Sequence, residues 1–425
     1  AVARNKPPCA AFFMAADPAS ANVREEDRHM NSDPTVPAPH FSLAPLMFQN
    51  FSCTLAIMAF VALVGPVAST LSLAAWHIGV AMTLGGFTWV FCARWWGAMG
   101  DRLGRRRVML RGLTGFIVSY FLLCVFIDKA LDWLLAPLLA FLGIALGRVI
   151  IGVFYAAVPA SAAAMVADNI PASQRAGAMA MLGAATGAGM VVGPGFVGLL
   201  APYGLGLPMY ATALLPLLAL LVVWQRLPDQ PPRASRAMPS PSLRDPRLRA
   251  PIVVAFAAAF SVSISQVVVG FFALDVLRLE ASAAAQTAGI ALTVVGVVLV
   301  LSQTLMRRLS WAPVTLIQRG AIIASIGFAG TAWVNTEWGL WACFAVAAAG
   351  MGWVYPSVSA LAANAVEAGE QGVVAGTVSA AQGAGVIVGP LVGTLVYAVN
   401  AVLPYTLVAA LLAVIAVVIK RLARI

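Results

Sequence analysis

Charged residues are scarce in this chain. Only 10% of its 425 residues are Asp, Glu, Lys or Arg, whereas a soluble domain carries about 25%. Hydrophobic residues make up 61% and occur in blocks of about 20, the length that a helix needs to cross a bilayer. This scarcity of charge excludes an ordinary soluble globular protein and predicts an integral membrane protein.

Lysine, histidine and paired cysteines are also rare. None of Lys6, Lys129 and Lys420 ends a glycine-rich loop as Gly-Lys-Ser/Thr, so ATP hydrolysis is not expected. His29 and His40 lie in the polar tail and His77 near a helix end, which leaves an intramembrane metal centre without ligands. The cysteines occur singly, with no disulfide framework. We expect neither an enzyme nor a bound cofactor or metal.

Twelve apolar blocks follow a polar segment of residues 1–41. Each predicts a spanning helix, because unpaired strands and loops cannot cross lipid with their backbone groups unsatisfied. The expected helices cover residues 43–65, 76–98, 108–127, 134–160, 175–200, 207–225, 252–274, 283–305, 313–334, 338–361, 373–397 and 400–419. We expect residues 1–41 to be a disordered tail, with Met30 as an alternative translation start.

Arginines mark one side of the membrane. They gather in the loops near 102–107, 226–249 and 307–308, while the other side has Lys129 and Arg278. By the positive-inside rule, both termini are cytoplasmic in a plasma (inner) membrane protein. The formal charge of +10 is therefore a topology signal and does not predict nucleic-acid binding.

The chain contains a repeat. Residues 187–194 (GAGMVVGP) match 383–390 (GAGVIVGP), and Pro159 matches Pro356. We predict two six-helix bundles, 42–226 and 251–425, joined by a cytoplasmic linker at 227–250. In such parallel repeats the substrate site lies near the bilayer midplane, between the halves.

The loop after the second helix carries a motif, Gly97-Ala-Met-Gly-Asp101-Arg102-Leu-Gly104-Arg105-Arg106-Arg107. A carboxylate at the C-terminal end of a helix is unfavourable by about 0.3 to 1 kcal/mol, so Asp101 needs a partner. The string resembles the GxxxDRxGRR loop of the major facilitator superfamily.

The resemblance implies a conformational latch. Asp101 would cap the start of helix eleven in the other half, and Asp168 and Arg175 would join the network, but only while the cytoplasmic ends are closed. The second half has Arg307 and Arg308 at the matching place, and Glu367 and Glu370 are their candidate partners.

A second motif resembles one that marks proton-driven exporters within the superfamily. Its residues are Gly189, Gly193, Pro194 and Gly198 in helix five and Gly385, Gly389 and Pro390 in helix eleven. The resemblance implies close helix packing and favours export over import. Small residues at helical spacing also serve as general packing devices in membranes.

Arg148 lies roughly 20 Å along the fourth helix, at about 1.5 Å per residue. A charge at that depth costs at least about 2.5 kcal/mol, so we expect it to face a wet cavity or a partner. The resemblance places an arginine followed four residues later by glycine, here Arg148 and Gly152, near the substrate cavity and implicates it in proton coupling. We infer a positive cavity, suited to an anionic or zwitterionic solute.

Other polar residues within the helices are lesser candidates for substrate or proton coupling. They are Gln49, Asn50, Ser261, Ser265, Gln266, Gln303, Trp353, Tyr355 and Gln382. Each alone is more typical of interhelical hydrogen bonding than of ligand contact.

The sequence therefore predicts an all-helical transporter with twelve spanning helices in two repeats. The resemblance is to drug:proton antiporters. We therefore expect the protein to export a small molecule by alternating access in exchange for protons, and to act as a monomer. Three alternatives stay open: export of an endogenous siderophore or metabolite, proton-coupled uptake of an organic acid, and a non-transporting sensor.

Overall fold

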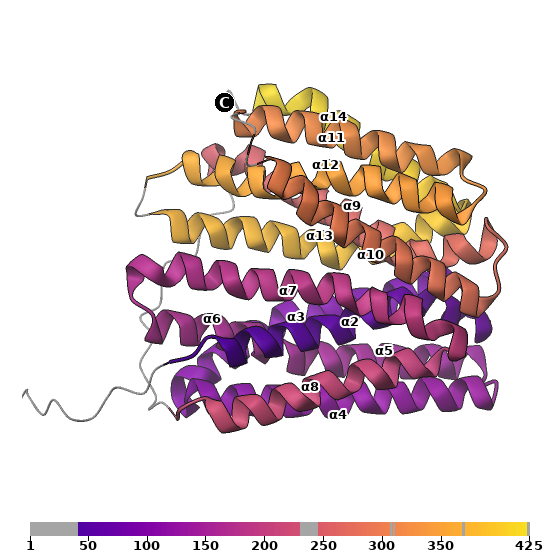
Figure 1. The fold of residues 1–425 in the computed structure, drawn as a ribbon, viewed down its shortest axis with the longest axis horizontal. Helices are drawn as coiled ribbons and strands as arrows, with labels where there is room; N and C mark the ends of the chain where they lie inside the picture. The colour runs from indigo at the N-terminus through magenta and orange to yellow at the C-terminus, as the bar shows by residue number, and fades with distance from the viewer. Residues whose placement is uncertain (1–40, 230–244, 307, 309–310, 368–369, 423–425) are drawn as a thin grey trace, which may run out of the picture. The chain divides into compact units, whose positions relative to one another are not determined.

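The computed structural model describes residues 41–229, 245–306, 308, 311–367 and 370–422. In this part of the chain twelve helical spans are long and apolar enough to cross a membrane (Figure 1). The helices are α2 (Ala44–Thr70), α3 (Ala75–Leu103), α4 (Arg105–Asp132), α5 (Pro137–Tyr155), α6 (Ala157–Asn169), α7 (Ala172–Leu200), α8 (Gly206–Arg226), α9 (Arg249–Asp275), α10 (Ala281–Met306), α11 (Pro313–Gly330), α12 (Glu337–Asn364), α13 (Gln371–Val399) and α14 (Leu403–Leu422). Short 3-10 turns η1 (Ala201–Tyr203), η2 (Pro246–Leu248) and η3 (Thr331–Trp333) complete the order.

The prediction of an all-helical membrane protein with twelve spans is confirmed. The predicted tail, apart from Phe41, and most of the predicted linker, residues 230–244, lie outside the described residues. The two-bundle division stays a prediction.

The predicted fourth helix is interrupted. It consists of α5 and α6, which meet at Ala156. Pro159 has no backbone N–H, so the carbonyl of Tyr155 lacks its helical donor, and the proline ring crowds that carbonyl. The matching Pro356 lies inside an unbroken α12.

Gly104 makes the turn between α3 and α4. Its φ is +92°, a conformation that side chains with a Cβ rarely adopt. The glycine of the charged loop motif therefore has a local structural reason, because it lets two long helices follow each other directly.

Glycines bring α7 onto α2 and α13 onto α9 in the same way. A methyl group at Gly189 would lie 2.5 Å from the Phe51 carbonyl oxygen, and one at Gly193 would strike that of Leu55. In the second half, methyl groups at Gly385 and Gly389 would lie 2.6 Å and 3.0 Å from the carbonyl oxygens of Phe256 and Phe260. The matched sequences thus make matched contacts, with small residues allowing close backbone approach.

The first six spans contact the last six at one end of the helices. A methyl group at Gly65 of α2 would lie 2.9 Å from Gly270 of α9, and one at Gly289 of α10 would lie 2.5 Å from the Gly198 nitrogen of α7. Figure 1 shows α10 crossing toward α7. Thr83 of α3 donates a hydrogen bond to the Ile387 carbonyl oxygen of α13 at 2.7 Å. We call this end, where Gly65, Gly198, Gly270 and Gly289 lie, the closed end.

Candidate functional site

A cavity of about 770 Å³ lies among α2, α7, α9, α10, α11, α12 and α13. Its polar lining residues are Ser265, Gln266, Gln303, Tyr355 and Gln382. Within the described part of the chain, the side chains that line it include no Asp, Glu, Lys, Arg or His. The volume suits a drug-sized organic molecule.

On the side away from the closed end, the cavity borders open space. Methyl groups built at Gly183 of α7 and Gly383 of α13 would meet no described atom within 4 Å. The same holds for Gly97 of α3 and Gly376 of α13, nearer the end that carries Asp101. We call this the basic end, because the arginines of the α3–α4 loop lie there.

Sequence reasoning found several of the lining residues. Ser265, Gln266, Gln303, Tyr355 and Gln382 were all candidates, and Pro194 of the glycine motif also borders the cavity. What it missed is the face of α7 from Ala180 to Val191 and Met58 of α2. No residue-type signal marks these positions, because alanine, glycine and methionine are equally suited to lipid contact and to helix packing.

Other candidates lie away from the cavity. Ser261 is fully buried and donates to the Ala257 carbonyl oxygen at 2.7 Å. Trp353 packs edge-on against Trp311, with ring centroids 5.7 Å apart. Gln49 and Asn50 are buried on α2, and the Gln49 side chain donates to the Val158 carbonyl oxygen at 3.5 Å.

Arg148 is enclosed among the helices of the first half. Its side chain is 8% exposed, and its guanidinium carbon lies 5.1 Å from the centre of the Phe60 ring. Its Nε and Nη1 atoms have no hydrogen-bond partner among the described residues. Arg148 is not among the side chains that line the cavity, so the expectation that it makes this cavity positive lacks structural support.

Gly152 lies where α5 meets α3. A methyl group there would collide with the Gly85 carbonyl oxygen and the Thr88 hydroxyl. Thr88 in turn donates to the Val149 carbonyl oxygen at 3.2 Å. The spacing of Arg148 and Gly152 therefore serves helix packing, with Arg148 directed toward α2.

The charged loop motif forms an ion-pair network at the basic end. Arg105 pairs with Asp101 one turn before it and with Asp168 of α6 at 3.4 Å, and donates to the Gly97 carbonyl oxygen at 3.2 Å. Arg106 pairs with Asp229 at 2.9 Å and donates to the Trp224 carbonyl oxygen at 2.6 Å. Asp101, Arg105 and Asp168 are thus brought together while open space borders this end, whereas the resemblance implied that the network forms only when the cytoplasmic ends are closed.

The remaining members of the predicted latch are placed differently. Arg175 donates to the Ile170 carbonyl oxygen at 2.9 Å, which caps the end of α6, and Arg102 is exposed. The contact of Asp101 with the start of α13 stays a prediction for a state in which the basic end is closed, because in this structure the flank of α3 at Gly97 borders open space.

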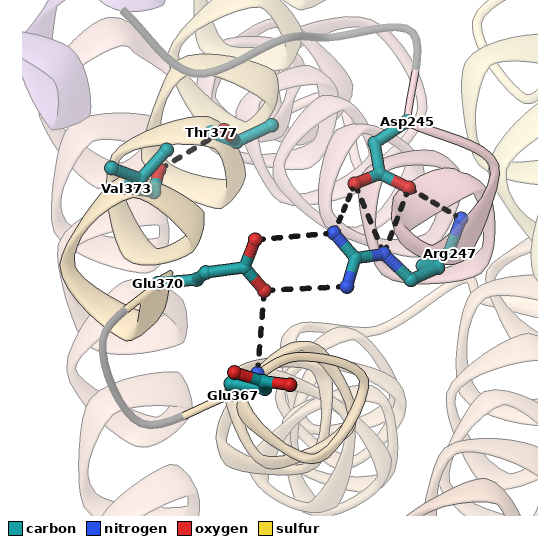
Figure 2. A network of polar contacts seen from close by, with 6 residues as sticks. All are labelled: Asp245, Arg247, Glu367, Glu370, Val373 and Thr377. Carbon is teal, nitrogen blue, oxygen red and sulfur yellow. Dashed lines mark hydrogen bonds and ion pairs between the residues drawn. The ribbon is translucent and has the colours of Figure 1, made fainter. Parts of the chain in front are cut away.

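A second network joins η2 to α13 (Figure 2). Arg247 pairs with Glu370 at 3.2 Å and with Asp245 at 2.8 Å. Hydrogen bonds from Arg247 hold the pKa of the Asp245 carboxyl below its ordinary value. The contact between Asp245 and Arg247 is therefore fully formed at any pH above the ordinary pKa of Asp, and it is lost as the pH falls through the lowered pKa. Glu370 therefore pairs with Arg247, whereas the sequence pointed to Arg307 and Arg308; Arg307 lies outside the described residues.

Replacing Asp101 by asparagine tests the first network. We expect transport to fall about tenfold, because the neutral amide lacks both the ion pair with Arg105 and the attraction to a helix N-terminus of about 0.3 to 1 kcal/mol. Thermal stability stays within about 0.5 kcal/mol, since Asp101 is 29% exposed and partly exposed pairs contribute little. Transport into membrane vesicles at matched protein amount measures the effect.

Asp132→Asn is the matched control for that variant. Asp132 also pairs with a residue on its own helix, Lys129, at 2.8 Å, but at the closed end. Equal losses of transport in the two variants would contradict a specific role for Asp101.

Two partly buried contacts at the closed end involve acids of the second half. Tyr397 donates to Asp275 at 2.7 Å, joining α13 to α9. Thr287 of α10 donates to Glu337 of α12 at 2.5 Å. In the described residues no group of three or more His, Cys, Asp or Glu side chains could hold a metal ion.

Comparison with known proteins decides the family. The family model described as Major Facilitator Superfamily matches residues 46–390, which is most of the chain. The chain belongs to the Major Facilitator Superfamily. Members of this superfamily are transporters, not enzymes, so the protein is a multi-pass inner-membrane transporter of a small molecule.

Relatives within the superfamily include tetracycline resistance proteins. The class C protein of Escherichia coli is 28% identical over 344 residues, which cover 76% of this chain and 81% of that protein. The class B protein of Escherichia coli is 38% identical over 150 residues, 35% of this chain. This match spans only 33% of the class B protein.

Solved structures share the fold. The human organic anion transporter MFSD10 (TETRAN) has a TM-score of 0.61 and 21% identity, covering 90% of this chain and 100% of that one. A bacterial homolog of the human lysosomal transporter Spinster, inward-facing and unoccupied, has a TM-score of 0.67 and 13% identity, covering 90% and 95%. At these identities the likeness shows the fold alone.

Proposed function

We propose that this transporter exports an organic small molecule from the cytoplasm by alternating access, in exchange for protons. One observation carries the proposal: a 770 Å³ cavity between helices of the two repeats, with the helices in contact at one end and open space at the other. A cavity with two alternately closed ends is what a secondary transporter requires.

The arginine distribution supports the orientation. Arg105, Arg106 and Arg247 all lie at the basic end, and the positive-inside rule places such loops in the cytoplasm. With this orientation the structure represents the state that loads substrate from the cytoplasm, and both termini are cytoplasmic.

The tetracycline resistance relatives support a drug substrate. They are similar over most of the chain in one case and over about a third in another. The prediction of an anionic or zwitterionic solute, such as a siderophore, depended on a positively charged cavity. Arg148, the residue expected to supply that charge, does not line the cavity. The lining therefore favours an antibiotic-like molecule over an organic acid.

Proton coupling requires a group that gains and loses a proton during the transport cycle. The cavity offers no carboxylate among its described lining residues, so the titrating group lies outside it. The ion pair of Asp101 with Arg105 and the contact of Asp275 with Tyr397 join helices whose ends move in alternating access. Arg148, buried without a partner, is the third candidate.

Everted membrane vesicles test the function. We expect vesicles that contain the protein to accumulate tetracycline when respiration acidifies their interior, and to release it when a protonophore collapses the gradient. Vesicles from cells with an empty vector provide the control. Accumulation that ignores the protonophore would contradict proton exchange, and accumulation only in right-side-out vesicles would establish uptake instead of export.

A further inference from the structure

Four side chains of the cavity have hydrogen-bonding groups with no partner among the described residues. They are Gln266, Gln303, Tyr355 and Gln382, from α9, α10, α12 and α13. All four are half-buried. Each amide offers two donors and an acceptor, and the phenol offers one donor. Ser265, by contrast, already donates to the Val262 carbonyl oxygen at 2.9 Å.

The wall from the first half differs in kind. It consists of Met58 of α2 and of alanine, glycine, methionine, valine and proline residues of α7 between Ala180 and Pro194. No side chain in this wall can donate or accept a strong hydrogen bond. Polar recognition is therefore one-sided, with the second half supplying the hydrogen bonds and the first half an apolar surface.

The lining also disfavours a ligand with a net charge. An ion moved from water into an apolar site is strongly disfavoured unless a counter-charge meets it. No described lining residue supplies one, and Arg148 is enclosed beside Phe60. A divalent cation carried with the ligand would lack carboxylate ligands as well.

The four groups lie at different depths. Counted along each helix at about 1.5 Å per residue from its basic end, Gln303 lies about 5 Å in, Tyr355 about 14 Å, Gln382 about 17 Å and Gln266 about 26 Å. The deeper three span the length of one drug-sized molecule. Gln303 lies near the mouth of the cavity.

We infer that the cavity binds a ligand of no net charge, with an apolar body and several hydroxyl or carbonyl groups, and that Gln266, Tyr355 and Gln382 hold those groups. The inference rests on the proposed function. It assigns affinity to the second half of the chain and makes binding independent of a metal ion.

Binding to the purified full-length protein in lipid nanodiscs tests this assignment. The probes are chloramphenicol, which is uncharged and carries hydroxyl and amide groups, tetraphenylphosphonium, a permanent cation, and benzylpenicillin, an anion. We expect chloramphenicol to bind most tightly, with an unchanged Kd when a chelator is present. Tighter binding of either ion would overturn the inference.

Leucine substitutions locate the recognition. We expect Gln266→Leu and Gln382→Leu each to raise the Kd for chloramphenicol about threefold to tenfold, the usual effect of one lost hydrogen bond, and Gln303→Leu to raise it less. Gln318→Leu is the matched control, because the Gln318 amide lies outside the cavity and already donates to the Ala416 carbonyl oxygen at 3.0 Å. Wild-type affinity in both Gln266→Leu and Gln382→Leu would overturn the assignment.

The vesicle experiment separates the two proposals. If chloramphenicol binds as expected but neither it nor tetracycline accumulates in energised vesicles, the transport proposal fails and the binding site stands. If vesicles concentrate tetraphenylphosphonium or benzylpenicillin in preference to chloramphenicol, the transport proposal stands and this inference fails.

Discussion

We expect Gly289→Leu to reduce transport to near background. Even the first carbon of a side chain at 289 would lie 2.5 Å from the Gly198 nitrogen and 2.6 Å from the Pro194 carbonyl oxygen. These are backbone atoms, so α7 and α10 must separate. Overpacking of this kind costs about 1 to 3 kcal/mol, which shifts the population away from the state with the closed end shut by roughly 5-fold to 150-fold.

Labelling detects the shift directly. Thr394 is fully buried where α13 meets Gly79 of α3 at the closed end. A cysteine in its place, in a background without other cysteines, reacts slowly with a maleimide applied to the closed-end face. We expect Gly289→Leu to accelerate that reaction at least about tenfold.

Val297→Leu is the control on the same helix. Val297 is 48% exposed and does not line the cavity, so added bulk there meets no packed backbone. Unchanged labelling and near-normal transport in Gly289→Leu would show that the glycine contact does not hold the closed end.

The second large effect is expected from replacing Arg148 by methionine. We expect this replacement to raise thermal stability and to lower proton-driven transport. Methionine fills a similar volume without the charge. Since a buried, unpaired charge costs at least about 2.5 kcal/mol, we expect Arg148→Met to be more stable than the wild type by roughly 1 to 3 kcal/mol. Thermal unfolding in detergent measures this change.

Proton-driven transport in Arg148→Met is expected to fall to background. Exchange of substrate across the membrane without a proton gradient is expected to stay within about threefold of wild type, because Arg148 does not line the cavity. Arg148→Lys retains the charge and is expected to recover part of the driven transport.

Arg319→Met is the comparison for both measurements. Arg319 also stacks on an aromatic ring, Trp311, at 4.0 Å, but it is exposed. A loss of stability in Arg148→Met would assign Arg148 a structural role, and loss of gradient-free exchange would place it in binding.

The sequence predicted the spans well because hydrocarbon imposes one length and one backbone solution on every segment. It did not predict the orientation of each helix about its own axis. A lipid-facing leucine and a core-facing leucine meet equally apolar surroundings, so the apolar face of α7 that lines the cavity carries no distinguishing signal.

The same limit explains which polar residues could be placed correctly from the sequence and which could not. Gln266 and Gln382 were recognised by residue type, and the structure places both in the cavity. Arg148 was recognised as costly in lipid, but whether an arginine faces a cavity or a neighbouring ring depends on its helix partners. The sequence pointed to Arg307 and Arg308 as partners of Glu370, whereas the structure pairs it with Arg247 of η2, at the end of the predicted linker.

The break at Ala156 separates two residues that the proposals rely on. Arg148 belongs to α5, which is tied to α3 through Gly152 and Thr88. Asp168 belongs to α6 and is tied to Arg105. Because Pro159 leaves the Tyr155 carbonyl without a donor, we expect the chain to bend most easily there. Asp168 would then move with the charged loop while the Arg148 side chain keeps its place within the membrane.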